Sequence, residues 1–315
     1  MSTPIKLDGM LVKVESSYGT DPTPSASTDS VRLSDRFWSS ITVTPAFPNR
    51  RENTAPGTLL PIAPGLPRGW MVTGEIGVEL RGAGAAYSAS VLPDVAVLLR
   101  SCGLTQAIDT TGGSEFVTYT PASSSHSSCT IYGYANGLLY IITGVRANVR
   151  WPWTAGGLGM LRFSFQGFLA AAPTTVSLPA ITYAAPVPPG AVAMSLTVGS
   201  WSPDVIGGEF DLGAVVQRND SGNATDGIAE FAISEFHPKV KLSTKAVLVA
   251  TANPHSDIRA ATSRAINWTY GATQYNKALL VNTNAYYASI RNTEQNRFTG
   301  WDLESDLVDA VIKFT

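Results

Sequence analysis

The chain has 315 residues, with 22 Lys and Arg against 24 Asp and Glu, a formal net charge of −2 and only 15% charged residues. This length suffices for one large domain or two small ones with a sizeable core. The balanced charge argues against a nucleic-acid reader, which normally carries a strongly basic surface. Apolar runs stay far below the ~18 residues of a membrane helix, which argues against a transmembrane protein.

The first 69 residues are predicted to be extended. Residues 15–30 show no hydrophobic periodicity and are interpreted as an N-terminal arm. The segment 44–69 is rich in proline, and long stretches without their own secondary structure are usually functional or disordered. Its prolines are Pro45, Pro48, Pro56, Pro61, Pro64 and Pro67.

Residues 70–172 are predicted to form a first β-rich half. After Trp70, the apolar residues Ile76, Val78 and Leu80 alternate with polar residues and glycine, which is typical of a half-buried strand. A helical spacing of apolar residues, with Pro93 near its start and Gly103 after its end, predicts a short helix near 93–102.

Two turn signals follow in this half. Asn136-Gly137 separates two strand-like runs and predicts a hairpin with a type I′ turn. The segment Gly156 to Gly159 separates two alternating runs, 145–151 and 161–165, and predicts a second hairpin. Together these signals predict a four-stranded antiparallel unit over about residues 115–169.

A Pro-rich joint at 173–190 is predicted to divide the chain, and residues 191–315 form a second β-rich half. Its short helix is expected near 255–264, before Ile266, Trp268 and Tyr270 resume the strand alternation. Each half thus has strands, a short helix and further strands. This order hints at an internal duplication, although the residues themselves show no self-similarity.

Candidate catalytic and metal-binding motifs fail on spacing. His126 and Cys129 lack the further ligands of a zinc site. The segment Asp220 to Gly227 superficially resembles a calcium loop, but its twelfth position would be Phe231 instead of glutamate. No catalytic residue, cofactor or metal ligand is therefore assigned.

Several segments, read in order, match the strand and turn pattern of a known family. They are residues 14–24, 119–121, 127–132, 137–140, 143–147, 210–213, 218–220 and 226–228. Through them the chain resembles the major tail tube proteins of long-tailed (siphovirus-type) bacteriophages. The low charge fits this family, because strands that pair with a neighbouring subunit need no charged residues to protect their edges.

The resemblance implies a mainly β fold: an antiparallel sandwich or partial barrel with one or two short flanking helices and long arms. It implies a non-enzymatic structural protein of the virion tail, assembled in the host cytoplasm as stacked rings around a channel for the genome. Six chains per ring are expected for a single-copy fold, whereas a true duplication would permit three.

The resemblance also implies partners. The chain would bind itself within and between rings, and it would meet tail tip or baseplate, tape measure and tail terminator proteins. Phage DNA would pass transiently and non-specifically, and the protein would not insert into a membrane. The arm and the Pro-rich loop 44–69 would join neighbouring rings, with the arm contacts assigned to Tyr18, Gly19, Asp21 and Pro22.

Charged strand positions supply the remaining candidates. Glu75 and Glu79 are predicted to line the channel, because a basic lining would bind DNA phosphates; an outer-wall position is the alternative. Arg146, Arg150 and Arg162 are predicted to form salt bridges with a neighbour's carboxylates, with a solvated outer face as the alternative.

Two other functions stay open at this point. One is the tube of a gene-transfer particle or of a tail-like bacteriocin. The other is a β-sandwich carbohydrate-binding module, which the seven Trp and eleven Tyr would permit. However, Trp151, Phe163 and Phe165 fall on the apolar sides of their strands, so they are predicted to be core residues instead of an exposed binding platform.

Overall fold

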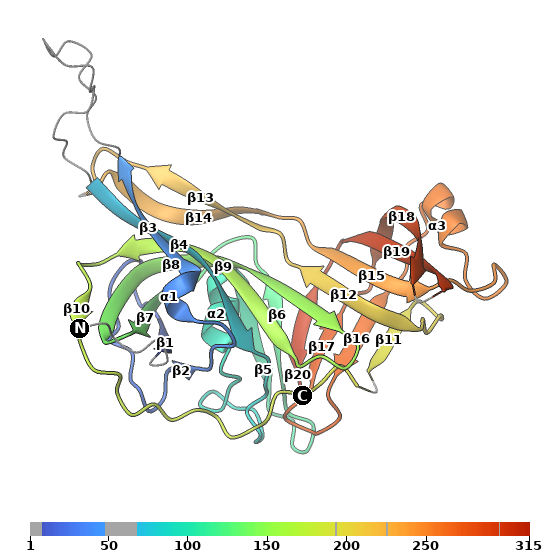
Figure 1. The fold of residues 1–315 in the computed structure, drawn as a ribbon, viewed down its shortest axis with the longest axis horizontal. Coiled ribbons are helices and arrows are strands. Elements are labelled where there is room, and N and C mark those ends of the chain that lie inside the picture. The colour runs from blue at the N-terminus through green and yellow to red at the C-terminus, as the bar shows by residue number, and fades with distance from the viewer. Residues whose placement is uncertain (1–7, 48–67, 193, 225, 296) are drawn as a thin grey trace, which may run out of the picture.

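The computed structural model describes residues 8–47, 68–192, 194–224, 226–295 and 297–315. Within these ranges the chain forms a 12-stranded sheet, a six-stranded sheet and a separate two-stranded hairpin, with three short helices (Figure 1). All strand pairs are antiparallel, and neither sheet closes into a barrel. The predicted mainly β, antiparallel sandwich is confirmed.

The large sheet is organised around one long strand, β8 (Leu138–Thr154). The first part of β8 pairs with β7 and β10, and its later part pairs with β9 on one side and β12 on the other. The other strands are β1 (Asp8–Val14), β2 (Ser30–Val31), β3 (Ile41–Phe47), β4 (Arg68–Glu79), β7 (Cys129–Ala135), β9 (Met160–Leu169), β10 (Thr174–Thr175), β12 (Val205–Asp211), β15 (Lys239–Lys245), β18 (Ala285–Gln295) and β19 (Phe298–Leu307).

The six-stranded sheet packs against one face of the large sheet. Its order is β11 (Ser195–Val198), β16 (Ile266–Tyr270), β17 (Ala278–Val281), β20 (Val311–Phe314), β6 (Phe116–Pro121) and β5 (Leu104–Asp109). Trp151 of β8 meets Trp268 and Tyr270 of β16, with ring centroids 5.6 and 5.9 Å apart. These three rings are fully buried, as are Phe163 and Phe165, so the predicted core positions are confirmed.

The predicted four-stranded unit over 115–169 is wrong in one strand. Its first strand, β6, lies in the six-stranded sheet between β5 and β20, where Tyr119 packs edge-on against Phe314 at 6.0 Å. The other three strands, β7, β8 and β9, are consecutive hairpins as expected. The β7–β8 turn has φ of 54° at Asn136 and 83° at Gly137, as a type I′ turn requires.

Both predicted helices are present. The first, α2 (Ala96–Ser101), buries Leu98 and Leu99 and ends before Gly103, which has a φ of 78°. The second, α3 (Pro254–Ala260), begins after Asn253, whose side-chain oxygen accepts a hydrogen bond from the Ser256 N–H at 3.1 Å. A third helix, α1 (Phe37–Ser40), was not predicted; it is a single turn that buries Phe37.

Strands from both halves of the chain share both sheets: β12 pairs with β8, and β20 pairs with β6. Residues 173–190, the predicted joint, run along the sandwich surface, where Arg81 donates to the Ala184 carbonyl at 2.8 Å. Two hairpins extend side by side from the large sheet (Figure 1). One is β3–β4; the other is β13 (Ala214–Asp220) with β14 (Ile228–Phe236). Most of the Pro-rich loop, 48–67, lies outside the described residues.

Asp94, just before α2, gives a pH-dependent prediction. Desolvation raises the pKa of its carboxyl from 3.8 to about 6; nearby Arg81 lowers it and Glu79 raises it further. Because the pKa is higher in the folded than in the unfolded chain, Asp94 costs stability as the pH rises from about 4 to 6. Asp94→Asn should therefore raise the unfolding free energy of the unassembled chain at pH 7.5, by at most about 3 kcal/mol, and change it little at pH 3.5.

Thermal unfolding of the two proteins at both pH values measures this difference. Asp226→Asn, at an exposed turn, is the matched control and should change stability at neither pH. An equal effect of Asp94→Asn at pH 3.5 and 7.5 would contradict the assignment.

Candidate functional site

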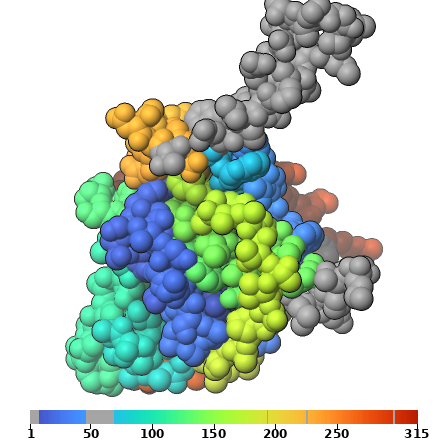
Figure 2. All heavy atoms as spheres, turned by 90° about the vertical axis from the view of Figure 1, so that its left-hand side faces the viewer, coloured from blue at the N-terminus to red at the C-terminus, as the bar shows by residue number. Residues whose placement is uncertain are grey.

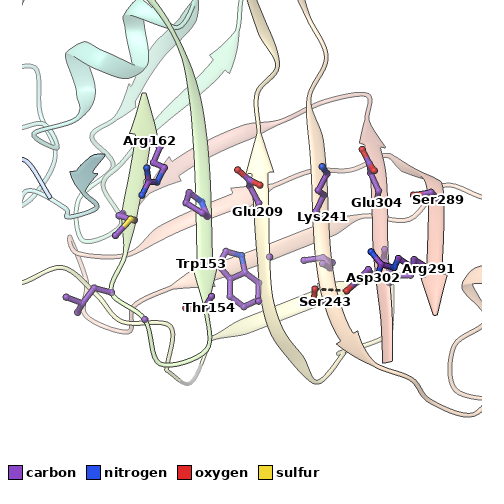
Figure 3. Close-up of a pocket in the computed structure, with 18 residues that line it drawn as sticks. Trp153, Thr154, Arg162, Glu209, Lys241, Ser243, Ser289, Arg291, Asp302 and Glu304 are labelled. Carbon is purple, nitrogen blue, oxygen red and sulfur yellow. Dashed lines mark hydrogen bonds between the residues drawn. The ribbon is translucent and has the colours of Figure 1, made fainter. Parts of the chain in front are cut away.

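The face of the large sheet opposite the six-stranded sheet carries a row of charged side chains (Figure 3). Glu209 of β12 lies directly across from Lys241 of β15, which in turn lies across from Glu304 of β19. Opposite charges at directly facing positions stabilise a sheet. The row thus alternates in sign from strand to strand, and we call this surface the polar face.

The polar face is hollowed over β8, β12, β15, β19 and β18, where it encloses a volume of about 760 Å³. On this face the backbone is bare at Gly207. The next residue, Gly208, faces the core, where its Cβ would lie 2.8 Å from the indole of Trp153. The charged residues lining this hollow are three basic and three acidic: Arg162, Lys241, Arg291, Glu209, Asp302 and Glu304. The hollow therefore carries no net charge.

Glu75, a predicted channel residue, lies on β4 between Arg150 and Arg162. Its carboxylate forms ion pairs with both guanidinium groups, at 3.0 Å from Arg162 Nη1. Arg150 is also 3.8 Å from Glu209, and Arg162 is 3.8 Å from Asp35. These groups are partly exposed, so each pair contributes at most about 1 kcal/mol. Two of the three predicted inter-subunit arginines thus have partners within the chain, and a bond to a neighbour's carboxylate stays a prediction.

The other candidates on these strands have different surroundings. Glu79, on the same side of β4 as Glu75, forms ion pairs with the buried Arg81 and, at 3.6 Å, with Arg32. Arg146 is itself buried; it donates to the Ser127 carbonyl and lies 5.6 Å from the centre of the Tyr18 ring. Desolvation lowers the pKa of Arg146. The structure therefore groups Arg150 and Arg162 but separates Arg146 from them.

The predicted arm residues contact the chain's own strands β7, β8 and β14, and the N-terminal part of the chain, in blue, lies on the surface shown in Figure 2. The Tyr18 hydroxyl donates to the Gly144 carbonyl at 3.0 Å and accepts from the Phe231 N–H at 2.7 Å, and burial raises its pKa to about 12. Asp21 accepts a hydrogen bond from the Tyr132 hydroxyl at 2.5 Å, and Pro22 beside it is half-buried. Contact of this arm with a second ring stays a prediction.

Glu15 holds the base of the arm. Its buried carboxylate accepts four hydrogen bonds of 2.6–2.8 Å, and the donors are Gly19 N–H, Ser128 Oγ, Thr130 Oγ1 and Gly144 N–H. Sequence reasoning missed this residue, because three of its partners are more than 110 positions away. The only local signal is Gly19, whose φ of 74° turns the arm back toward the carboxylate.

The fold and this surface define the class of protein: an antiparallel β sandwich whose distinguishing feature is a broad, hollowed, mixed-charge sheet face. A family model described as phage tail tube protein matches residues 9–297, nearly the whole chain. The chain belongs to the phage tail tube protein family, which confirms the resemblance. It is therefore a structural component of a phage tail tube.

No curated protein matches the chain. Among the described residues, no group of three or more His, Cys, Asp or Glu is placed to hold a metal ion. In the same part of the chain, no helix is long and apolar enough to cross a membrane.

Glu15→Gln tests the role of the buried carboxylate. The amide keeps one acceptor oxygen but presents an NH₂ group toward donors, so the substitution should cost roughly 2–3 kcal/mol of unfolding free energy. It should also speed cleavage within residues 16–29 by a broad-specificity protease. Unfolding in urea and mass spectrometry of the fragments measure the two effects.

Glu235→Gln, at an exposed site, is the matched control and should behave as the wild type. Unchanged stability together with unchanged cleavage of the arm in Glu15→Gln would show that Glu15 does not hold it.

Proposed function

We propose that this tail tube protein assembles into stacked rings in which the polar face of the large sheet lines the channel. The observation that carries the proposal is the hollow of about 760 Å³ on that face. The opposite face is covered by the six-stranded sheet. A ring in which the large sheet continues from one chain to the next would therefore expose the polar face on its inner or its outer wall. The hollow favours the inner wall.

The charge of the hollow supports the same orientation. A wall that neutralised several phosphates in each ring would bind DNA non-specifically, with Kd of roughly 10⁻⁴ to 10⁻⁶ M, and would slow the genome. Three acidic residues balance three basic ones in the hollow. Beside it, Glu75 pairs with Arg162, one of those three basic residues, and with the guanidinium group of Arg150. On this proposal, Glu75 and Glu79 both face the channel.

The finer assembly is also part of the proposal. Each ring has six equivalent β units around the channel and performs no catalysis. The arm, through Tyr18, Gly19, Asp21 and Pro22, and the loop 44–69 reach an adjacent ring, and Arg146, Arg150 and Arg162 approach a neighbour's carboxylates. Tail tip or baseplate and tail terminator proteins bind the tube ends, and the tape measure protein lies in the channel. Assembly takes place in the host cytoplasm.

Negative-stain electron microscopy of the purified protein, at low and high concentration, tests the ring assembly. We expect hollow rings at low concentration and tubes at high concentration. Compact monomers at both concentrations would contradict the proposal, and binding of such monomers on a glycan array would favour a carbohydrate-binding module.

The channel lining is tested by the double variant Glu75→Lys, Glu79→Lys, which raises the net charge of each chain by four. If these residues face the channel, assembled tubes should retain labelled duplex DNA at low salt and release it as salt rises. Particles carrying the variant should deliver their genome more slowly.

The matched control is Asp109→Lys, Glu115→Lys, which adds the same charge around the β5–β6 turn of the six-stranded sheet. Normal DNA delivery by the Glu75, Glu79 variant, or equal DNA retention by both variants, would place the polar face on the outer wall.

A further inference from the structure

Eight strands of the large sheet form two four-stranded units with the same connectivity. The order across the sheet is β3-β4-β9-β8 followed by β12-β15-β19-β18. In each unit the first two strands belong to one long hairpin and the last two to a second hairpin. The second strand pairs with the later strand of that second hairpin, β4 with β9 and β15 with β19.

Further features repeat with the strands. A short helix follows the second strand in each unit, and it contacts the fourth: α2 contacts β8, and α3 contacts β18. The first hairpin extends beyond the sheet in both, as β3–β4 and as β13–β14 (Figure 1). The six-stranded sheet does not repeat in this way, since β5–β6 and β16–β17 lie on opposite sides of β20. The repeat is thus a property of the large sheet and its helices.

The two units are joined by the antiparallel pairing of β8 with β12, in which Arg150 lies opposite Asp211. This junction leaves β3 and β18 as the outer strands of the eight. Within the described residues β3 pairs only with β4, and β18 pairs only with β19 except at Ala285, which also bridges Arg264. An unpaired strand edge is usually protected by charged residues. The β3 segment Ile41 to Thr44 carries none, and its Thr42 and Thr44 side chains are exposed.

We propose that β18 of one chain pairs with β3 of a second copy as β8 pairs with β12 within the chain, so that three chains close a ring of six units. The proposal rests on the proposed ring assembly and replaces the six chains expected for a single-copy fold. Three chains supply 24 strands, which at ~4.8 Å spacing and ~40° tilt give a backbone diameter of about 50 Å. Six chains would give about 100 Å.

The register of the new pair is proposed by matching Arg291 to Arg150, since each lies on the polar face of the fourth strand of its unit. In the first unit, Arg150 of β8 faces Arg162 of β9, and Arg162 faces Gly77 of β4. In the second unit, Arg291 of β18 faces Asp302 of β19, and Asp302 faces Ser243 of β15. Thr73, four positions before Gly77 on β4, faces Thr42 of β3. Lys239, four positions before Ser243 on β15, faces Asp211 of β12. Thr42 therefore corresponds to Asp211, and Arg291 corresponds to Arg150. Because Arg150 lies opposite Asp211, Arg291 should lie opposite Thr42 of the next chain.

Cysteine cross-linking tests this pairing in the full-length chain. Facing residues of an antiparallel pair have Cα atoms about 4.5–5.5 Å apart, within reach of a disulfide. The double variant Thr42→Cys, Arg291→Cys, and in parallel Thr44→Cys, Ser289→Cys, is assembled, oxidised and run on a non-reducing denaturing gel. The native Cys102 and Cys129 are fully buried and should not compete.

We expect covalent dimers and trimers and no larger species, with each single variant giving none. The matched control Thr111→Cys, Arg291→Cys keeps one edge cysteine and moves the other to the β5–β6 turn, so it should also give none. Electron micrographs of the same samples show whether rings or tubes form. They therefore distinguish a failure of the ring assembly from a failure of the β18–β3 pairing. Tubes without cross-links in either double variant would overturn the β18–β3 pairing in this register and leave the tube intact.

Covalent species of up to six chains would overturn the three-chain ring. The absence of both rings and cross-links would overturn the ring assembly itself, and this inference with it.

Discussion

The antiparallel pairing of β8 with β12 is the interaction on which the rest of the structure depends. It joins strands from the two halves of the chain into one sheet, and it brings Trp151 of β8 over Trp268 of β16 in the core. Gly208 of β12 is required there, because any side chain would collide with Trp153. A single backbone ladder therefore sets both the sandwich core and the continuity of the polar face.

That continuity explains the pattern of charge. Side chains alternate between the two faces of a strand, so a sheet buried on one face concentrates its charged residues on the other. Here they form cross-strand pairs such as Glu209 with Lys241, and Glu75 lies between two arginines. The result is a surface that is strongly polar but balanced. Such a surface suits a wall past which a polyanion moves without adhering.

Local features of the fold could be predicted from the sequence, because their signals are local. The Asn136-Gly137 turn, the helix bounded by Pro93 and Gly103, and the alternation through Trp151 each depend on a few neighbouring residues. Long-range features could not. The sheet to which β6 belongs is decided by its pairing with β20, almost 200 residues later. Likewise, the partners of Glu15 and Glu75 come from strands far along the chain.

In the proposed tube, the polar face of a continuous large sheet lines the channel. A helical reconstruction of the assembled tube by electron cryomicroscopy tests it most directly. We expect Glu75 and Glu209 on the innermost layer, with the six-stranded sheet outside it and β18 beside β3 of the next chain. A tube whose innermost layer is the six-stranded sheet would contradict it.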